Sequence, residues 1–214
     1  MTLRLYYHPL SSFCWKALIA LYEKGVDFTP QLVDFSDPEQ EAAFRALWPV
    51  RKFPVLKDEA EDRLIPESSI IIEYIDQKFP EGPRLIPADP TQAREMRLRD
   101  RFFDLYVHVP MQKVMTDRLR PEGQHDPYGV DQAKAQIETC YRMIDQDMDG
   151  RTWLMGDDFT MADCAALPAL FYGNMAVPIG ENRNVAAYLD RLKQRPTVAR
   201  VLREAEPYFK YVPQ

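Results

Sequence analysis

The sequence changes character at a proline-rich stretch, and this change constrains the fold more than any other feature. Short apolar runs alternate with helical patterns before the stretch, whereas only helical patterns follow it. Four prolines fall within 80–90, and prolines at that density interrupt any helix. We therefore predict two domains, 1–79 and 91–214, joined by a linker at 80–90.

The first domain shows the element order β-α-β-α-β-β-α. Strands are expected at 3–7, 28–33, 53–57 and 63–65, and helices at 14–24, 38–47 and 69–79. A β-α-β unit implies parallel pairing through a right-handed crossover, and the short link between the last two strands implies a hairpin. The pattern predicts an α/β domain whose sheet contains both kinds of pairing.

The second domain is expected to be all helical. Periodic apolar positions predict helices at roughly 91–118, 130–149, 161–173, 182–194 and 196–205. At the start of the third of these, Thr160 can cap free amides, and the Asp163 carboxylate can reach back to the Thr160 amide. These two residues predict a capping box.

Composition and charge limit the classes of partner. The chain has 46% hydrophobic and 28% charged residues, which is typical of a folded globular protein. With 27 basic and 33 acidic residues the net charge is −6, which argues against nucleic acid or an anionic membrane surface as a partner. No apolar run approaches the roughly 20 residues that span a bilayer.

The cysteines and the N-terminus indicate a cytoplasmic protein. Cys14, Cys140 and Cys164 are far apart and lack the spacing of metal ligands, so we expect free thiols in a reducing compartment and no metal site. The first residues contain neither a basic segment nor a long apolar stretch, so secretion is not expected.

Four segments carry a family resemblance, three in the first domain and one in the second. They are Ser11-Ser-Phe-Cys-Trp-Lys16, Lys52-Phe-Pro-Val-Leu56, Pro66-Glu-Ser-Ser-Ile-Ile-Ile-Glu-Tyr74 and Phe159-Thr-Met-Ala-Asp163. With these segments in this order, the chain resembles the cytosolic glutathione transferases over essentially its whole length. The resemblance implies a thioredoxin-like first domain, an all-helical second domain, glutathione as co-substrate and a homodimer.

The first segment is similar to that of serine-type transferases, including the zeta class. The zeta class carries Cys where this chain has Phe13, which argues against a maleylacetoacetate isomerase-type activity. Ser11 is the predicted catalytic residue, because its hydroxyl and the amides of a helix N-terminus can stabilise a thiolate. The alternatives are that Ser11 only caps the helix or that the Tyr7 phenol holds the sulfur. Cys14 is expected to be a buried structural thiol.

The resemblance also assigns residues to glutathione. A cis Pro54 would expose the backbone of Phe53, so that the cysteinyl unit pairs with Phe53 like an added strand. Ser68 and the amides of its helix would meet the γ-glutamyl carboxylate, and Glu67 would receive the ammonium group. Lys52 is the expected partner of the glycyl carboxylate, and a solvated surface lysine is the alternative.

A second-substrate pocket is expected between the domains. Its apolar wall would consist of Leu10, Tyr106, His108, Pro110 and Phe171. Because no other metal-ligating residues cluster with His108, a metal role is not expected there. A solvated helix face is predicted for the stripe Arg94, Arg97 and Arg101, and contact with a partner subunit is the alternative.

These features predict an enzyme, a detoxifying glutathione transferase that joins or exchanges the glutathione thiolate with a small electrophilic molecule. Two alternatives stay open. The first is glutathione-dependent isomerisation or peroxide reduction, and the second is a non-catalytic module that uses the fold for protein contacts. The complete set of Ser11, Phe53-Pro54 and Glu67-Ser68 argues against the non-catalytic module.

Overall fold

A four-stranded sheet forms the base of the computed structural model, which describes residues 2–212. Its strands, in the spatial order β2-β1-β3-β4, are β1 (Leu3–Tyr7), β2 (Thr29–Leu32), β3 (Val55–Asp58) and β4 (Arg63–Pro66). β1 pairs with β2 in parallel, whereas the β1–β3 and β3–β4 pairs are antiparallel. The predicted order of elements and the thioredoxin-like α/β domain are confirmed.

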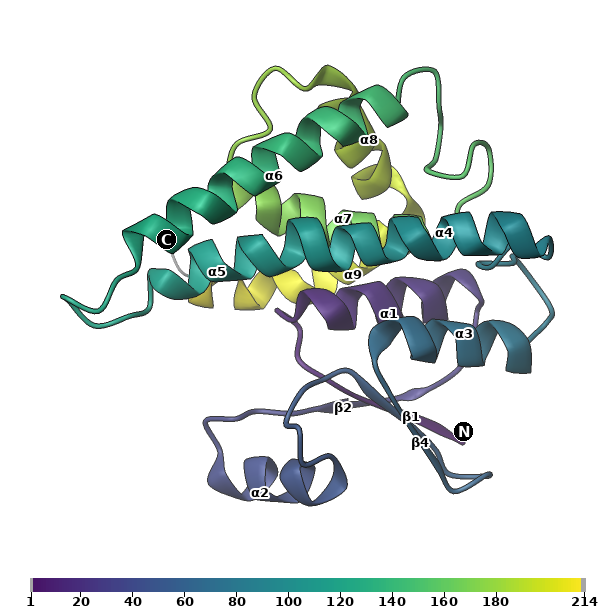
Figure 1. The fold of residues 1–214 in the computed structure, drawn as a ribbon. Helices are drawn as coiled ribbons and strands as arrows, with labels where there is room; N and C mark the ends of the chain where they lie inside the picture. Colours follow the sequence, from purple (N-terminus) through teal and green to yellow (C-terminus); the bar gives the residue numbers. More distant parts are fainter. Residues whose placement is uncertain (1, 213–214) are drawn as a thin grey trace.

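The two faces of the sheet are covered by different helices (Figure 1). The covering helices are α1 (Ser12–Glu23) and α3 (Ser68–Lys78) on one face and α2 (Pro38–Leu47) on the other. Side chains alternate along β1, so Leu5 packs into the main core with α1 and α3. Its neighbour Tyr6 packs on the opposite side against Phe44 of α2.

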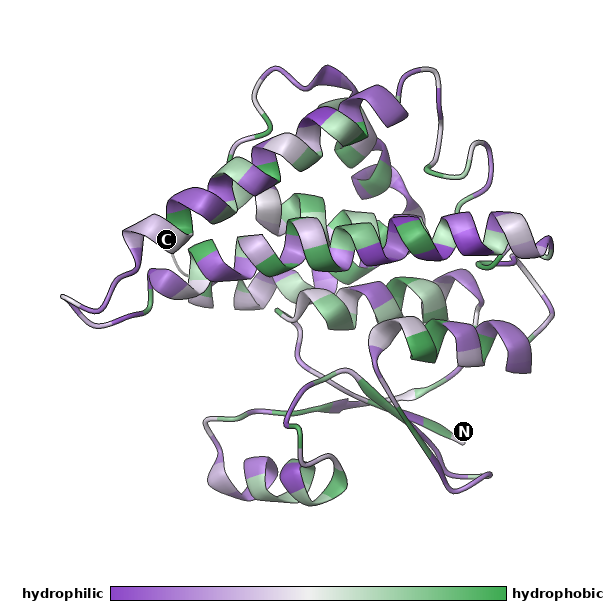
Figure 2. Cartoon of the chain, viewed as in Figure 1, coloured by the Kyte–Doolittle hydropathy of each residue, from purple (hydrophilic) through white to green (hydrophobic). Residues whose placement is uncertain are grey.

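The described part of the second domain consists of helices joined by loops, as the sequence predicts. They are α4 (Pro90–Phe102), a π-helical segment (Phe103–His108), α5 (Val109–Asp117), α6 (Pro127–Asp147), α7 (Met161–Ala176), α8 (Arg183–Gln194), α9 (Pro196–Ala205) and a 3₁₀ helix (Glu206–Tyr211). Figure 2 shows α7 as mostly hydrophobic, in keeping with its burial at the centre of the domain. None of the helices within 2–212 is long and apolar enough to cross a membrane.

One helix is expected at 91–118, but the structure interrupts it with the π-helical segment. In a regular helix the amide of residue 110 would donate to the carbonyl of Tyr106, and Pro110 has no amide hydrogen. The Tyr106 carbonyl instead accepts hydrogen bonds from Gln136 Nε2 (3.3 Å) and Cys140 Sγ (3.4 Å) on α6. The π-helical turn and Pro110 therefore change which side chains of this helix face the first domain.

A buried polar network joins the two domains. Lys16 of α1 is inaccessible to solvent, and its Nζ lies 2.6 Å from Asp100 Oδ1 and 2.8 Å from Asp104 Oδ2. Ser69 of α3 accepts hydrogen bonds from Lys16 and Arg101 and donates one to Asp100. Burial raises the pKa of Asp104, and the charge of Lys16 opposes this rise. The network fixes the start of α3 against α1 and α4.

The predicted capping box at the start of α7 is confirmed, and its acid does more than cap the helix. Asp163 is fully buried and accepts from the amides of Thr160 (2.8 Å) and Leu154 (3.0 Å). The Tyr188 hydroxyl of α8 also donates to it, at 2.6 Å. A single carboxylate thus links α7, the loop before it and α8.

Replacing this acid should destabilise the protein. Asp163→Ala is expected to lower the free energy of unfolding by about 2–5 kcal/mol, because several buried donors lose their acceptor. Urea denaturation measures the loss, with Asp157→Ala on the exposed part of the same loop as the matched control. Equal unfolding midpoints for the wild type and Asp163→Ala would contradict this role.

Removing the buried lysine should also destabilise the protein, in a pH-dependent way. Lys16→Met is expected to cost about 3–5 kcal/mol near neutral pH, because two buried carboxylates lose their buried counter-ion and keep only the half-exposed Arg101. Burial already raises the folded-state pKa of Asp104 above its unfolded value, and loss of Lys16 raises it further. The native state then binds protons more readily than the unfolded state, so the deficit should shrink as the pH falls.

Denaturation of Lys16→Met at acidic and at neutral pH checks this dependence. The control is Lys134→Met on α6, whose side chain is partly exposed and should shift stability by less than about 0.5 kcal/mol. A deficit in Lys16→Met that stays constant across the pH range would show that the two carboxylates do not respond to the missing charge.

Candidate functional site

The N-terminus of α1 reaches the boundary between the domains. Ser11 is the residue that caps α1, and its Oγ accepts a hydrogen bond from the Cys14 amide at 3.3 Å. Accepting this bond occupies a lone pair and leaves the hydroxyl hydrogen, which can point either to Cys14 Sγ or to a ligand. The capping role and a role toward a thiolate are therefore compatible in one side chain.

Tyr7 faces a different part of the molecule. It lines a cavity of about 390 Å³ together with Tyr22 of α1 and with Arg200 and Glu204 of α9. Burial raises the pKa of the Tyr7 phenol, and the nearby Glu204 carboxylate adds to the rise. Both effects disfavour the ionised phenol. The Tyr7 cavity shares no lining residue with the two cavities described next.

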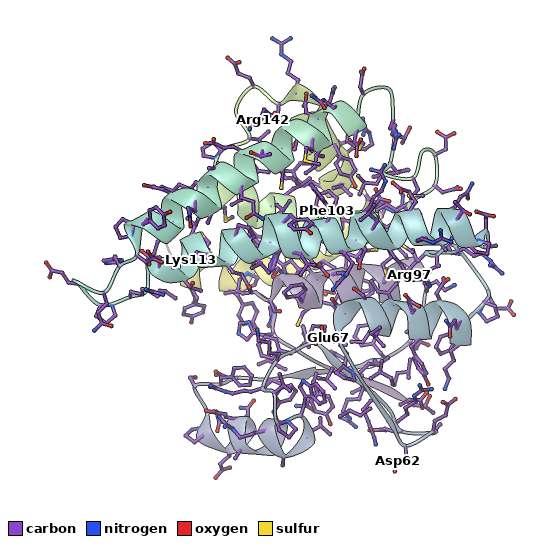
Figure 3. The ribbon with its side chains drawn as sticks, in the orientation of Figure 1. Asp62, Glu67, Arg97, Phe103, Lys113 and Arg142 are labelled. Atoms are coloured by element: carbon purple, nitrogen blue, oxygen red, sulfur yellow. The ribbon has the colours of Figure 1, made fainter. Side chains whose placement is uncertain are left out.

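All five residues predicted to bind glutathione line a second cavity, of about 240 Å³, which we call the Glu67 cavity. Its lining residues are Phe13, Lys52, Phe53, Pro54, Glu67, Ser68, Arg101, Asp104, Leu105, Val109 and Gln112. The Phe53–Pro54 peptide bond is cis, as expected from the sequence. Figure 3 shows Glu67 at the N-terminus of α3, between the sheet and the helical domain.

The backbone shapes the Glu67 cavity at the start of α3. Glu67 has a φ of 73°, in the left-handed region that side chains other than glycine rarely adopt. Its side chain forms no capping hydrogen bond with α3, so the carboxylate is not used to cap the helix N-terminus. Ser68 is the first residue of α3 and is buried. Free α3 amides and an exposed carboxylate are thus placed side by side.

The helical domain contributes residues to this cavity that the sequence did not predict as site residues. Arg101 is exposed, as expected of a solvated face, but it also bonds Ser69 and Asp104, and both Arg101 and Asp104 line the cavity. Arg97 is also engaged, through a two-pronged ion pair with Glu73 of α3. The sequence does contain a signal for the contact between Arg101 and Asp104. The two residues are three positions apart, which places their opposite charges on neighbouring helical turns.

A third cavity, also of about 240 Å³, adjoins the Glu67 cavity, and Gln112 of α5 lines both. We call it the apolar cavity. Its lining residues are Leu10, Ser12, Met111, Gln112, Met115, Thr116, Leu119, Tyr172, Tyr211 and Val212. The cavity lies between α1, α5, α7 and the C-terminal 3₁₀ helix, so both domains contribute to it.

Of the residues predicted to line this second-substrate pocket, Leu10 lines the apolar cavity, whereas Tyr106, His108, Pro110 and Phe171 do not. Tyr106 is half exposed and packs against Phe102, while Phe171 packs against Trp15. The π-helical turn shifts the register of the helix. A regular helical repeat therefore predicts the wrong side of the helix for Tyr106.

His108 lies behind the wall of the apolar cavity. It is 2% exposed, and its Nε2 is 2.9 Å from Ser12 Oγ. The Phe13 ring packs edge-on against it, with 4.4 Å between the ring centroids. Burial lowers the pKa of His108 to about 3, with a contribution from the charge of Lys16, so the imidazole is neutral near pH 7.

The cysteines are free and buried, and Cys14 is a packed thiol as expected. Burial raises the pKa of Cys14 to about 12, although the hydrogen bond with Ser11 opposes the rise. A thiol in this state is a poor nucleophile at neutral pH. Within residues 2–212, no three His, Cys, Asp or Glu side chains are grouped so that they could hold a metal ion.

Comparisons with known proteins agree with this architecture. The family model "Glutathione S-transferase, N-terminal domain" matches residues 5–83, and "Glutathione S-transferase, C-terminal domain" matches 111–196. A glutathione S-transferase-like protein, LUC7, from Fusarium is 30% identical over 178 residues, which cover 81% of this chain and 78% of that protein.

Two solved bacterial structures are also similar. A glutathione S-transferase from Methylobacillus flagellatus, crystallised with GSH bound, is 26% identical with a TM-score of 0.84, covering 93% of this chain and 98% of that one. A glutathione S-transferase from Rhodospirillum rubrum is 28% identical with a TM-score of 0.80, covering 94% and 91%. From its two domains, its matched segments and these relatives, the chain belongs to the cytosolic glutathione S-transferase family.

Proposed function

We propose that this glutathione transferase binds glutathione in the Glu67 cavity and directs its thiolate at a small electrophile in the apolar cavity. The observation that carries the proposal is the meeting of the two cavities at Gln112, beside the N-terminus of α1. A charged tripeptide and an apolar partner would then lie next to each other. Holding both reactants at one place removes much of the entropic barrier to their reaction.

The residues of the Glu67 cavity match the charges of glutathione. The γ-glutamyl carboxylate would bind at the α3 amides and Ser68, and the ammonium group would bind the Glu67 carboxylate. The backbone of Phe53 would pair with the cysteinyl unit, and Lys52 would bind the glycyl carboxylate. Each end of the tripeptide thereby meets a group of opposite charge, which sets its direction in the cavity.

Ser11 is proposed to hold the thiolate. A free thiol has a pKa near 8.5, and a hydroxyl donor together with a helix N-terminus stabilises the ionised form. Ser11 lines neither cavity itself, but the next two residues, Ser12 and Phe13, line the apolar cavity and the Glu67 cavity, respectively. Because Tyr7 lines a separate cavity, this placement supports Ser11 over the phenol. Isomerisation of an unsaturated substrate would use the same thiolate, by addition followed by elimination.

A homodimer is proposed through α3 and α4. The helices and the π-helical segment that follows α4 expose apolar side chains at Ile70 (53%), Leu98 (59%) and Leu105 (47%). The ion pair between Arg97 and Glu73 holds α3 and α4 together as one surface. A second copy of this chain would cover these side chains and remove them from water. The three buried free thiols support the proposed cytoplasmic location.

The role of Ser11 can be tested on bound glutathione. Ser11→Ala should raise the pKa of the bound thiol by about one unit or more, because the ionised sulfur loses a hydrogen-bond donor. Ultraviolet absorbance of the thiolate against pH measures this shift, and calorimetry should show glutathione affinity changed by less than about threefold. Tyr7→Phe should leave the thiolate pKa in place.

Glu67→Gln provides the complementary variant. It should weaken glutathione binding by roughly tenfold or more through loss of a charged partner. The thiol pKa of the glutathione that still binds should stay close to the wild-type value. A thiolate pKa that moves in Tyr7→Phe but not in Ser11→Ala would assign the sulfur to Tyr7 instead. A wild type that binds no glutathione would remove the proposed function.

The proposed dimer predicts the mass in solution. Light scattering should give about twice the 25.0 kDa of one chain, and Leu98→Glu should shift the population toward single chains by placing a charge in the interface. Tyr128→Glu, at an exposed tyrosine on α6, is the control and should remain dimeric. A wild type that stays monomeric at all concentrations would rule out this interface.

A further inference from the structure

The apolar cavity contains a hydroxyl that is held from behind by a buried histidine. Ser12 is the first residue of α1 and directly follows Ser11, and its Oγ lies 2.9 Å from His108 Nε2. Ser12 lines the apolar cavity, whereas His108 lies out of reach behind it. The pair spans the domain boundary, because Ser12 belongs to α1 and His108 to the π-helical segment.

The neutral state of His108 matters for what Ser12 can do. A neutral imidazole carries one N–H and one bare nitrogen, and either can meet a hydroxyl. When Nε2 carries the hydrogen, it donates to Ser12 Oγ, and the Ser12 hydrogen is then free to point into the cavity. A ligand oxygen in the cavity favours this arrangement, because both hydroxyl functions are then satisfied.

Two other hydroxyls of the cavity wall, on Thr116 and Tyr172, are already used by the fold. Thr116 Oγ1 donates to the carbonyl of Gln112 at 2.7 Å, within its own helix. The Tyr172 hydroxyl donates to the carbonyl of Leu10 at 2.9 Å. Ser12 differs because its partner is a histidine that can donate as well as accept. The wall also contains the Tyr211 hydroxyl, on a residue that is 66% exposed to solvent. Ser12 is therefore the buried hydroxyl among these four whose hydrogen the backbone does not take.

We propose that Ser12, supported by His108, is a specificity-determining residue that donates a hydrogen bond to the carbonyl oxygen of the electrophile. The substrate class would be small apolar alkenes conjugated to a carbonyl group. Methionine and leucine side chains would hold the hydrocarbon part, and Ser12 would orient the oxygen. This inference rests on the proposed function, because it needs glutathione thiolate in the neighbouring Glu67 cavity.

The reaction follows from this placement. The thiolate attacks the β-carbon, so a C–S bond forms while the C=C π bond breaks. Its electron pair moves through the α-carbon to the carbonyl oxygen and gives an enolate. The hydrogen bond from Ser12 strengthens as negative charge develops on that oxygen, which lowers the barrier. Water then supplies a proton to the α-carbon, replacing the proton that glutathione lost on ionisation.

The test compares two electrophiles as substrates of the wild type and of a variant that lacks the Ser12 hydroxyl. Benzylideneacetone carries a carbonyl conjugated to its alkene, and benzyl chloride reacts by displacement and has no oxygen. Ser12→Ala should lower kcat/KM for benzylideneacetone by about tenfold or more, and change that for benzyl chloride by less than about threefold. In Thr116→Val, any loss should affect the two electrophiles equally, because the Thr116 hydrogen is bound to Gln112.

A binding measurement on the wild type tests the role of Ser12 even if Ser12→Ala does not fold. Benzylacetone is the unreactive, saturated form of the ketone, and butylbenzene has the same carbon skeleton without the oxygen. With glutathione present, the wild type should bind benzylacetone more tightly by about tenfold, and Ser12→Ala should lose most of this preference.

The outcomes separate the inference from the proposed function. A wild type that converts benzyl chloride, with no preference for benzylacetone and an unchanged ratio of electrophiles in Ser12→Ala, overturns the role of Ser12 and leaves the transferase in place. A wild type that converts neither electrophile and leaves the pKa of glutathione unshifted overturns the proposed function and this inference with it.

Discussion

The ion pairs of buried Lys16 with Asp100 and Asp104 hold together the elements that carry the site. Lys16 lies on α1, and both carboxylates lie on the helix that begins the second domain. Ser69 adds α3 to the same network. A buried charge costs much free energy unless its partners are in place, so the network forms only when the two domains are docked in one arrangement.

That arrangement places the start of α1 and the start of α3 near one another. Both helices have free amides at these ends, and a helix N-terminus favours negative charge. Ser11 stands at the first and Ser68 at the second, and the cis Phe53–Pro54 segment lines the Glu67 cavity together with Ser68. In the proposed complex, the thiolate and the γ-glutamyl carboxylate of glutathione would bind at these two separate helix N-termini.

The apolar cavity depends on the same docking, through the helix that carries Asp104. Pro110 cannot donate to the Tyr106 carbonyl, and the π-helical turn before it changes the direction of the following side chains. Met111 and Met115 consequently line the cavity, whereas Tyr106 lies outside it. The position of His108 behind Ser12 is a consequence of the same turn.

The sequence by itself determined the features that depend on neighbouring residues. Strand and helix periods, the proline-rich boundary, the capping box of Thr160 and Asp163 and the first-domain motifs that line the Glu67 cavity could be predicted, because each is encoded within a short segment. The residues that the helical domain adds to that cavity, such as Arg101 and Gln112, could not. Only the tertiary structure decided which distant side chains meet. The Ser12–His108 contact joins residues 96 positions apart, and the change of helical register at the π-helical turn decides which side chains reach the apolar cavity. A local sequence pattern cannot predict such contacts, because they form only when the domains pack together.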